Sequence, residues 1–297
     1  MRIFVTGGSG FVGSHLVSRW SQDGHRITAL TRDPARNPGL ATLPGVTLLA
    51  GDLRDRTLLA SALPGHDAIV HHALIWGAPE DDLELEDVQA GARLLEAAGA
   101  AGVGLAVFTS STAVHRPFLA EMDEASPVRP ADYYAATKAA GELVLGAVAR
   151  QGGMRYLVVR LAPVIGAPAF VGAPFKCDDR FGAIAHAARA GRDVVVRSGE
   201  GLQPIGAAQA AEVYAAALAS SLDGETLIAA AADFITWEAI ARRTVSACGS
   251  SSQVVLSDAP PASTYRFDVG KLERTLGLRF LASPLLEGHL AEVARRT

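Results

Sequence analysis

Apolar and polar positions alternate in blocks along the first half of the chain. Short apolar runs are each followed by a longer stretch in which apolar residues recur three or four positions apart. The first pattern is typical of strands buried on both faces, and the second is typical of amphipathic helices. The expected strands cover 3–6, 27–31, 46–49, 68–71, 105–110 and 156–161. The expected helices cover 14–22, 55–63, 83–101 and 133–151.

This alternation of strand and helix predicts an α/β fold, a Rossmann-type doubly wound parallel sheet whose ligands bind at the carboxyl ends of the strands. The pattern changes after residue 165, because 166–182 is rich in Gly, Ala, Pro and Phe and shows little periodicity. Later segments predict helices at 183–190, 208–218, 236–248, 268–276 and 284–295, with short strands at 194–197 and 226–229. We expect a first domain over 1–165, which also takes in part of 203–222, and a smaller mixed α/β domain over 166–297.

Composition narrows the class of protein. The chain has 297 residues, enough for a sizeable core, and 49% of them are hydrophobic. No apolar run approaches the ~20 residues that span a membrane, and the chain starts with a core strand rather than a signal peptide. Its net charge of -4 is dispersed, and Cys177 and Cys248 are too few for a disulfide framework or a zinc site. We therefore expect a cytoplasmic protein that binds a small molecule, and neither nucleic acid, membrane nor metal.

Three glycines separate the first strand from the first helix. Gly7 permits a tight turn, Gly10 lets the backbone approach phosphates, and Gly13 lets the helix pack closely on the strand. The helix then offers free N–H groups and the positive end of its dipole to an anion. Such glycines can form simple turns, but the order of strand, turn and helix predicts a dinucleotide site. Phe11 and Val12 belong to its cofactor-binding segment.

The residues after the second strand bear on which nicotinamide dinucleotide binds. An acid there binds the ribose hydroxyls of NAD, whereas a base accommodates the 2′-phosphate of NADP. Thr31 takes the place of the acid and Arg32 follows, which favours NADP. A solvated Arg32, or NAD binding through Asp33, is the alternative. Asp52 and Leu53 follow the third strand and are expected near the adenine, although Asp52 could equally cap the next helix.

A serine cluster and a tyrosine–lysine pair supply candidate chemistry. Tyr134 and Lys138 are four residues apart on an expected helix and so share a face. A free tyrosine has a pKa of about 10, which a nearby lysine cation would lower. Ser111 ends a strand, where its hydroxyl can orient a carbonyl or an alcohol, with Ser110 as the substitute if the register differs by one. Such groups manage a proton while a nicotinamide carries the hydride.

With these motifs the chain resembles the extended short-chain dehydrogenase/reductases of the NAD-dependent epimerase/dehydratase type. The resemblance covers nearly the whole chain and rests on 6–13, 51–53, 109–114, Tyr134 with Lys138, and 160–166. It implies that Ser111 positions the substrate oxygen, that Tyr134 is the acid or base, and that Lys138 holds the nicotinamide ribose. Further residues that it places beside the cofactor are Ala73, Pro163 and Val164. It also implies a homodimer formed through the helices at 83–101 and 133–151.

Departures from the family pattern favour one branch. Nucleotide-sugar epimerases usually carry Asn where this chain has Pro163, and an Arg where it reads 201–205. Dehydratases carry an acidic pair where it has Thr112 and Ala113. By contrast, 31–34 resembles NADPH-dependent carbonyl reductases of the dihydroflavonol-reductase type. The sequence thus favours an NADP(H)-dependent oxidoreductase that interconverts a ketone or aldehyde and an alcohol. A nucleotide-sugar epimerase acting by transient oxidation and a non-catalytic NADP-binding regulator are the alternatives.

Candidate substrate contacts lie on the segments expected to border the cleft: Trp76, His115, Phe170 and Phe175. If the aromatic residues line the site rather than the core, the substrate is apolar or aromatic. His115 is equally compatible with a solvated loop position. The acidic run at 81–87 is expected to be a solvated helix start that suits the helix dipole. Selectivity is expected to lie in loops 74–82, 115–130 and 166–182.

Overall fold

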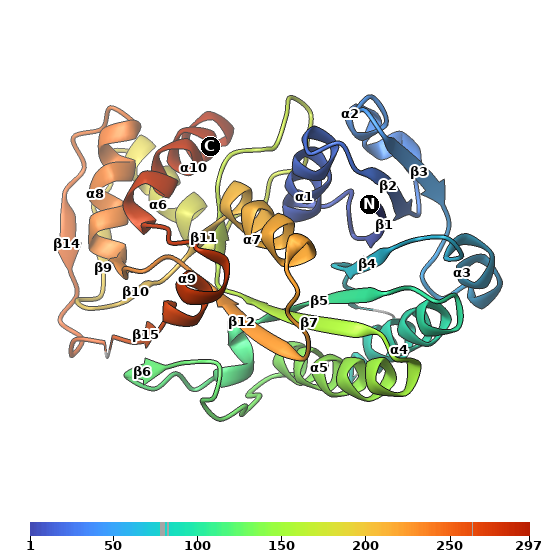
Figure 1. Cartoon of the computed structure of the whole chain (residues 1–297). Coiled ribbons are helices and arrows are strands. Elements are labelled where there is room, and N and C mark those ends of the chain that lie inside the picture. Colours follow the sequence, from blue (N-terminus) through green and yellow to red (C-terminus); the bar gives the residue numbers. More distant parts are fainter. Residues whose placement is uncertain (78–80, 82, 263) are drawn as a thin grey trace.

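A seven-stranded sheet forms the centre of the computed structural model, which describes residues 1–77, 81, 83–262 and 264–297. The strand order is β12-β7-β5-β4-β1-β2-β3, and every neighbouring pair is parallel. The strands are β1 (Arg2–Thr6), β2 (Arg26–Thr31), β3 (Val46–Ala50), β4 (Ala68–His71), β5 (Leu105–Ser111), β7 (Arg155–Leu161) and β12 (Glu225–Ala229). The predicted Rossmann-type α/β fold is confirmed (Figure 1).

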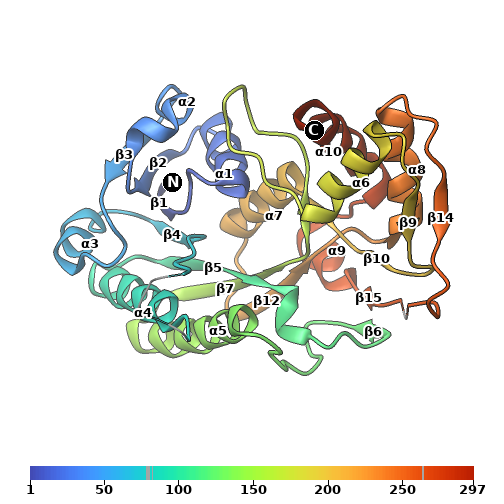
Figure 2. The same cartoon turned by 180° about the vertical axis from the view of Figure 1, so that it is seen from behind.

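Helices cover both faces of this sheet, as Figures 1 and 2 show from opposite sides. On one face, α1 (Phe11–Gln22) packs against α7 (Ala207–Ala219). The other face carries α3 (Arg56–Ala62), α4 (Leu85–Ala100) and α5 (Tyr133–Gly152). The central strands are buried on both sides, because side chains that alternate between the two faces are all covered by helices. The carboxyl ends of β1, β4 and β5 therefore meet at one edge of the sheet.

Strand β12 brings part of the last third of the chain into the main sheet. The sequence pattern predicts 226–229 as a short strand of the smaller domain. In the structure, Leu227 and Ile228 are instead fully buried and pair with Val159 and Arg160 of β7. Local periodicity identifies a strand but not the strand that it joins. The boundary at residue 165 stays a prediction, but the chain returns to the first sheet after crossing into the smaller unit.

The smaller unit contains α6 (Asp179–Arg189), α8 (Trp237–Ala247) and α10 (Ala282–Arg296), which pack together beside β9 (Val194–Val196) and β14 (Val254–Leu256). Phe181, Trp237 and Leu286 lie in its core. Short strands extend from or link the units: β8 (Val164–Ile165) with β11 (Ile205–Gly206), β10 (Gly201–Leu202) with β13 (Ile235–Thr236), and β6 (Glu121–Met122) with β15 (Arg266–Phe267). The remaining helical elements are η1 (Pro34–Arg36), α2 (Pro38–Ala41), η2 (Thr112–His115) and α9 (Gly270–Leu276).

Several helices begin earlier than the apolar pattern predicted. Helix α6 starts at Asp179 rather than near residue 183, because the Asp178 side chain accepts a hydrogen bond from the backbone N–H of Arg180. Polar capping residues do not contribute to apolar periodicity, so the pattern misses the first turn. In the described part of the chain, no helix combines the length and apolar character needed to cross a membrane.

Candidate active site

The glycine turn between β1 and α1 is tightly packed. Gly7 has a φ of +74°, and a Cβ added to it would lie 2.6 Å from the backbone nitrogen of Ala73. A Cβ on Gly13 would lie 2.0 Å from the carbonyl oxygen of Gly7, which accepts a hydrogen bond from the Gly10 N–H at 3.1 Å. The turn therefore requires glycine at both positions, and the structure brings Ala73 against it.

Helix α1 presents its N-terminus at this turn. Its N-cap is Gly10, which has no side chain to occupy the first N–H groups, and the first turn carries no acid. The first N–H groups of a helix lack intrahelical partners, so those of Phe11, Val12 and Gly13 are free to bind an anion. These residues fit the pyrophosphate of a dinucleotide.

Two guanidinium groups, those of Arg32 and Arg54, follow the neighbouring strands β2 and β3. Arg32 is exposed just after β2, and its charge helps to lower the pKa of Asp52. The larger cause is Arg54, whose Nη2 is 2.8 Å from Asp52 Oδ2, and the pKa of Asp52 falls to about 2. The sequence patterns did not point to Arg54, although it directly follows Leu53. The Leu53 side chain itself is buried in the hydrophobic core.

Two acids of this region, Asp33 and Asp55, cap short helices. Asp33 caps η1, where its Oδ1 accepts from the Ala35 N–H at 3.0 Å. The expectation that Asp52 might cap the next helix was wrong, because Asp55 caps α3 and accepts from the Leu58 N–H at 3.0 Å. Asp52 instead bonds Arg54.

Ser111 and Tyr134 are brought together at the carboxyl end of β5. A hydrogen bond with Ser111 acts to lower the pKa of Tyr134, but burial outweighs it and raises the pKa above the ordinary value of tyrosine. The Ser110 hydroxyl points elsewhere and donates to Glu142 Oε1 at 2.5 Å. Ser110 is thus engaged by Glu142, whereas Ser111, whose Oγ accepts a hydrogen bond from the Ala113 N–H at 3.1 Å, is the serine that acts on the pKa of Tyr134.

Lys138 lies one turn along α5 from Tyr134, and its side chain is buried. Its Nζ is 3.6 Å from Asp87 Oδ2, so the nearest countercharge comes from α4. Burial lowers the pKa of Lys138, and Asp87 opposes that effect. The expectation that the lysine lowers the pKa of Tyr134 differs from this structure, in which the pKa of Tyr134 is raised. The expectation that Asp87 belongs to a solvated face was also wrong, because Asp87 is only 4% exposed.

The four candidate substrate residues do not all lie near Tyr134. Trp76 does, because its ring centroid is 6.0 Å from that of Tyr134 in an edge-on arrangement, and it is 48% exposed. Residues 78–80 and 82 of its loop lie outside the described part of the chain. His115 is buried, with Nδ1 3.2 Å from the carbonyl oxygen of Pro127 and Nε2 3.1 Å from Arg160 Nη1. It is therefore neither solvated nor left with a free ring nitrogen.

Phe170 and Phe175 of loop 166–182 pack on the N-terminal part of the chain instead. The Phe170 ring covers Gly39 of α2, where an added Cβ would lie 2.7 Å from Cε2 of the ring. Phe175 packs on Phe11 at the start of α1, with ring centroids 5.8 Å apart, and on His289 of α10 at 5.4 Å. Phe175 thus joins the loop to the predicted cofactor-binding segment and Phe170 joins it to α2, whereas neither contact is with Trp76.

The segment after β7 supplies the remaining predicted cofactor residues. The Pro163 carbonyl oxygen accepts from the Ile205 N–H at 2.9 Å, and Val164 pairs with Ile205 in the two short parallel strands. Pro163 itself is exposed. The segment is thereby held next to α7, which packs on α1.

A buried ion pair behind the serines was missed by the sequence analysis. Arg160 Nη2 lies 2.7 Å from Glu142 Oε2, and the pair also contacts Ser110 and His115. Glu142 follows Lys138 by four residues, as Lys138 follows Tyr134, so all three lie on one stripe of α5. The position of Glu142 on this stripe was a signal for the acid, but the stripe carries none for its partner Arg160, which lies on β7.

Fold and site together define a dinucleotide-binding protein of the Rossmann class. A model of the NAD dependent epimerase/dehydratase family matches residues 3–226, and the chain belongs to that family. The resemblance found in the sequence is confirmed.

Curated relatives match over only part of their length. A dTDP-glucose 4,6-dehydratase from Streptomyces niveus is 33% identical over 180 residues, covering 54% of this chain and 53% of the relative. A putative dihydroflavonol 4-reductase from a Synechocystis species is 34% identical over 113 residues, covering 37% of this chain and 32% of the relative. The chain thus spans about half or less of these relatives, which as a group include epimerases, dehydratases and dehydrogenases or reductases.

Solved structures match over the whole chain. A dTDP-glucose 4,6-dehydratase from Streptomyces venezuelae, solved with NAD bound, has a TM-score of 0.79 and is 26% identical. The match covers 99% of this chain and 96% of that one. The fold of the smaller unit is therefore shared as well as that of the main sheet.

Proposed function

We propose that the protein is an NADP(H)-dependent oxidoreductase that interconverts a ketone or aldehyde and an alcohol on a small apolar or aromatic substrate. The observation that carries the proposal is the placement of Tyr134 one helical turn from the buried Lys138, on a helix that packs against the end of β5 where Ser111 lies, with the exposed ring of Trp76 6.0 Å from that of Tyr134. Residues 166–297 would supply the rest of the substrate-binding region.

In this reaction the cofactor supplies or accepts a hydride, and the protein handles the proton. Ser111 orients the substrate oxygen, and the Tyr134 hydroxyl donates its proton to that oxygen as the carbonyl becomes an alcohol. Because its pKa is raised, Tyr134 is a phenol at neutral pH and is ready to donate.

The residues near the expected adenosine support NADP over NAD. Thr31 offers no carboxylate to ribose hydroxyls, and Arg32 has no acidic partner at ion-pair distance in the part of the chain that the structure describes. Arg54 is partly neutralised by Asp52 and Glu86. Arg32 is thus the better partner for a 2′-phosphate.

The principal alternative is a nucleotide-sugar epimerase that oxidises its substrate transiently and keeps its cofactor. Epimerases and dehydratases among the relatives favour it. A reductase consumes NADPH in proportion to product, whereas an epimerase consumes none, so the loss of NADPH absorbance during turnover separates the two. A non-catalytic NADP-binding regulator would have no use for Ser111, Tyr134 and Lys138 together.

The test of the proposal is Tyr134→Phe, assayed with NADPH and a panel of apolar and aromatic ketones. Turnover should fall by a factor of about 100 or more, because the proton donor is lost, while the affinity for NADPH stays unchanged. The control is Tyr133→Phe, since Tyr133 precedes it on α5 and is 55% exposed. Near-normal turnover by Tyr134→Phe contradicts the proposed role.

We also propose a cytoplasmic homodimer that associates through α4 and α5. These helices pack side by side and carry the exposed residues Leu85 and Leu143, the latter 76% exposed. Exposed apolar side chains such as these favour burial against a second copy. Sedimentation at micromolar concentration should give twice the mass of the chain.

A further inference from the structure

One buried carboxylate, Asp87, uses both of its oxygens next to the candidate active site. Oδ1 accepts a hydrogen bond from the backbone N–H of Ile75 at 2.8 Å, and Oδ2 lies 3.6 Å from Lys138 Nζ. The side chains of Asp87 and Lys138 are 4% and 5% exposed. Asp87 therefore joins the lysine to the loop that carries Trp76.

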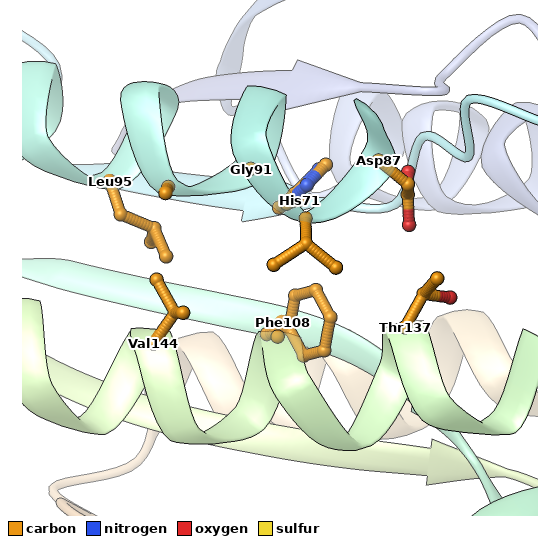
Figure 3. A pocket seen from close by; sticks show the side chains of 10 residues that line it. His71, Asp87, Gly91, Leu95, Phe108, Thr137 and Val144 are labelled. Atoms are coloured by element: carbon orange, nitrogen blue, oxygen red, sulfur yellow. The ribbon is translucent and has the colours of Figure 1, made fainter. Parts of the chain in front are cut away.

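Among the residues that the structure describes, Lys138 is the cation at ion-pair distance from Asp87. It borders a cavity of about 10 Å³ between α4 and α5, which holds at most about one water. Figure 3 shows Asp87 and His71 on one side of this cavity, with Phe108 and Thr137 on the other. An ionised carboxylate that cannot be hydrated needs a cation close by, and Lys138 is that cation.

The charged and titratable groups that face Lys138 come from three elements. Asp87 lies on α4, His71 and His72 on and just after β4, and Tyr134 on α5 itself. Both histidines feel the charge of Lys138, which helps to lower the pKa of each of them. The Phe108 ring lies 5.4 Å from Lys138 Nζ and adds a cation–π contact. Asp87 is thus the one anion among these groups.

We infer that Asp87 is a positioning residue, which keeps Lys138 charged beside Tyr134 and ties that charge to the Trp76 loop. The role in turnover rests on the proposed function, whereas the ion pair itself does not. Without the carboxylate, Lys138 would be a buried charge with no partner, so it would lose its proton at a lower pH.

The first test is Asp87→Asn in the direction of carbonyl reduction. An amide oxygen can still accept from the Ile75 N–H, so the substitution removes the charge and keeps the loop contact. Asp87 raises the pKa of both Lys138 and Tyr134, so its loss moves both in the same direction. The high-pH limb of kcat/KM should shift by about one unit or more towards lower pH.

The matched control for this profile is Glu96→Gln, because Glu96 is an exposed acid on the same helix. Its pH profile should coincide with that of the wild type. If Asp87→Asn lowers kcat/KM equally at every pH, Asp87 acts only through packing and the inference is overturned.

The second test needs no turnover. Urea unfolding of the wild type and of Asp87→Asn is compared from pH 6 to pH 10. The ratio of their folding constants should be largest near neutral pH. At higher pH the ratio should fall, because Lys138 loses its proton at a lower pH in Asp87→Asn than in the wild type. The total fall should be about tenfold for each pH unit between the Lys138 pKa values of the two folded proteins.

In a Lys138→Met background the ratio should show no fall between pH 8 and pH 10, because the lysine that titrates there is absent. A pH-independent ratio in the wild-type background overturns the ion pair itself. If the protein turns over no carbonyl substrate but the ratio behaves as expected, the proposed function fails and the pairing of Asp87 with Lys138 stands.

Discussion

At the scale of single residues, the two arginines near the expected adenosine differ in how far neighbouring acids neutralise their charge. Arg32 follows the strand at which a dinucleotide's adenosine would end, whereas the neighbouring Arg54 is held by Asp52 and Glu86. A guanidinium that remains available can bind a phosphate with two hydrogen bonds. We therefore expect cofactor choice to depend on Arg32 more than on the rest of the strand.

Arg32→Ser should weaken NADPH binding by about tenfold or more and leave NADH binding nearly unchanged, because a charge-assisted contact contributes roughly 1.5–3 kcal/mol. Fluorescence titration with each cofactor measures the ratio of the two affinities. Arg26→Ser is the control, since Arg26 is exposed at the opposite end of the same strand. Equal losses for NADPH and NADH would refute the role given to Arg32.

At the scale of elements, the glycine turn between β1 and α1 leaves no room for an added side chain at Gly13. Gly13→Ala forces a Cβ against the carbonyl oxygen of Gly7, so β1 and α1 must separate. We expect a loss of about 1–3 kcal/mol in the free energy of unfolding and a large loss of cofactor affinity. Urea unfolding and NADPH titration measure the two.

Gly182→Ala provides the matched comparison. Gly182 lies inside α6, and nothing lies within 4 Å of an added Cβ. Alanine favours a helix over glycine by about 0.5–1 kcal/mol, so this variant should be more stable than the wild type. If both alanine variants have the same stability, the steric argument at Gly13 fails.

The elements also show what a sequence can predict. The strands of the main sheet and the Ser111, Tyr134 and Lys138 group follow from local patterns, because each pattern reports its own strand or helix. Asp87 with Lys138 and Glu142 with Arg160 pair residues of different elements, so no local pattern reports them. Strand β12 was recognised as a strand, but its place beside β7 depends on the path of the whole chain.

For the whole molecule, buried histidines couple stability to pH. His71 is 2% exposed and bonded to Thr6 Oγ1, and burial lowers its pKa to about 3. In the unfolded chain the same group takes up a proton near pH 6.5. Since the folded pKa lies below the unfolded one, stability is lost as the pH falls from about 6.5 towards 3.

From pH 7 to pH 5, His71 alone should therefore cost about 2 kcal/mol in the free energy of unfolding. Urea unfolding at these two pH values measures the loss. The variant His71→Asn should start from a lower stability at pH 7 but lose less on acidification. An equal loss in variant and wild type would mean that His71 is not the group that titrates.

Strand β12 also bears on how the chain behaves when it is cut. After a single nick in the loop at 166–178, the second fragment still contributes β12 and α7 to the sheet and helix layer of the first. The nicked protein should migrate as one particle on gel filtration and separate only in denaturant. A fragment ending at residue 165 would expose β7 as an open edge, so it should aggregate when it is expressed without the rest.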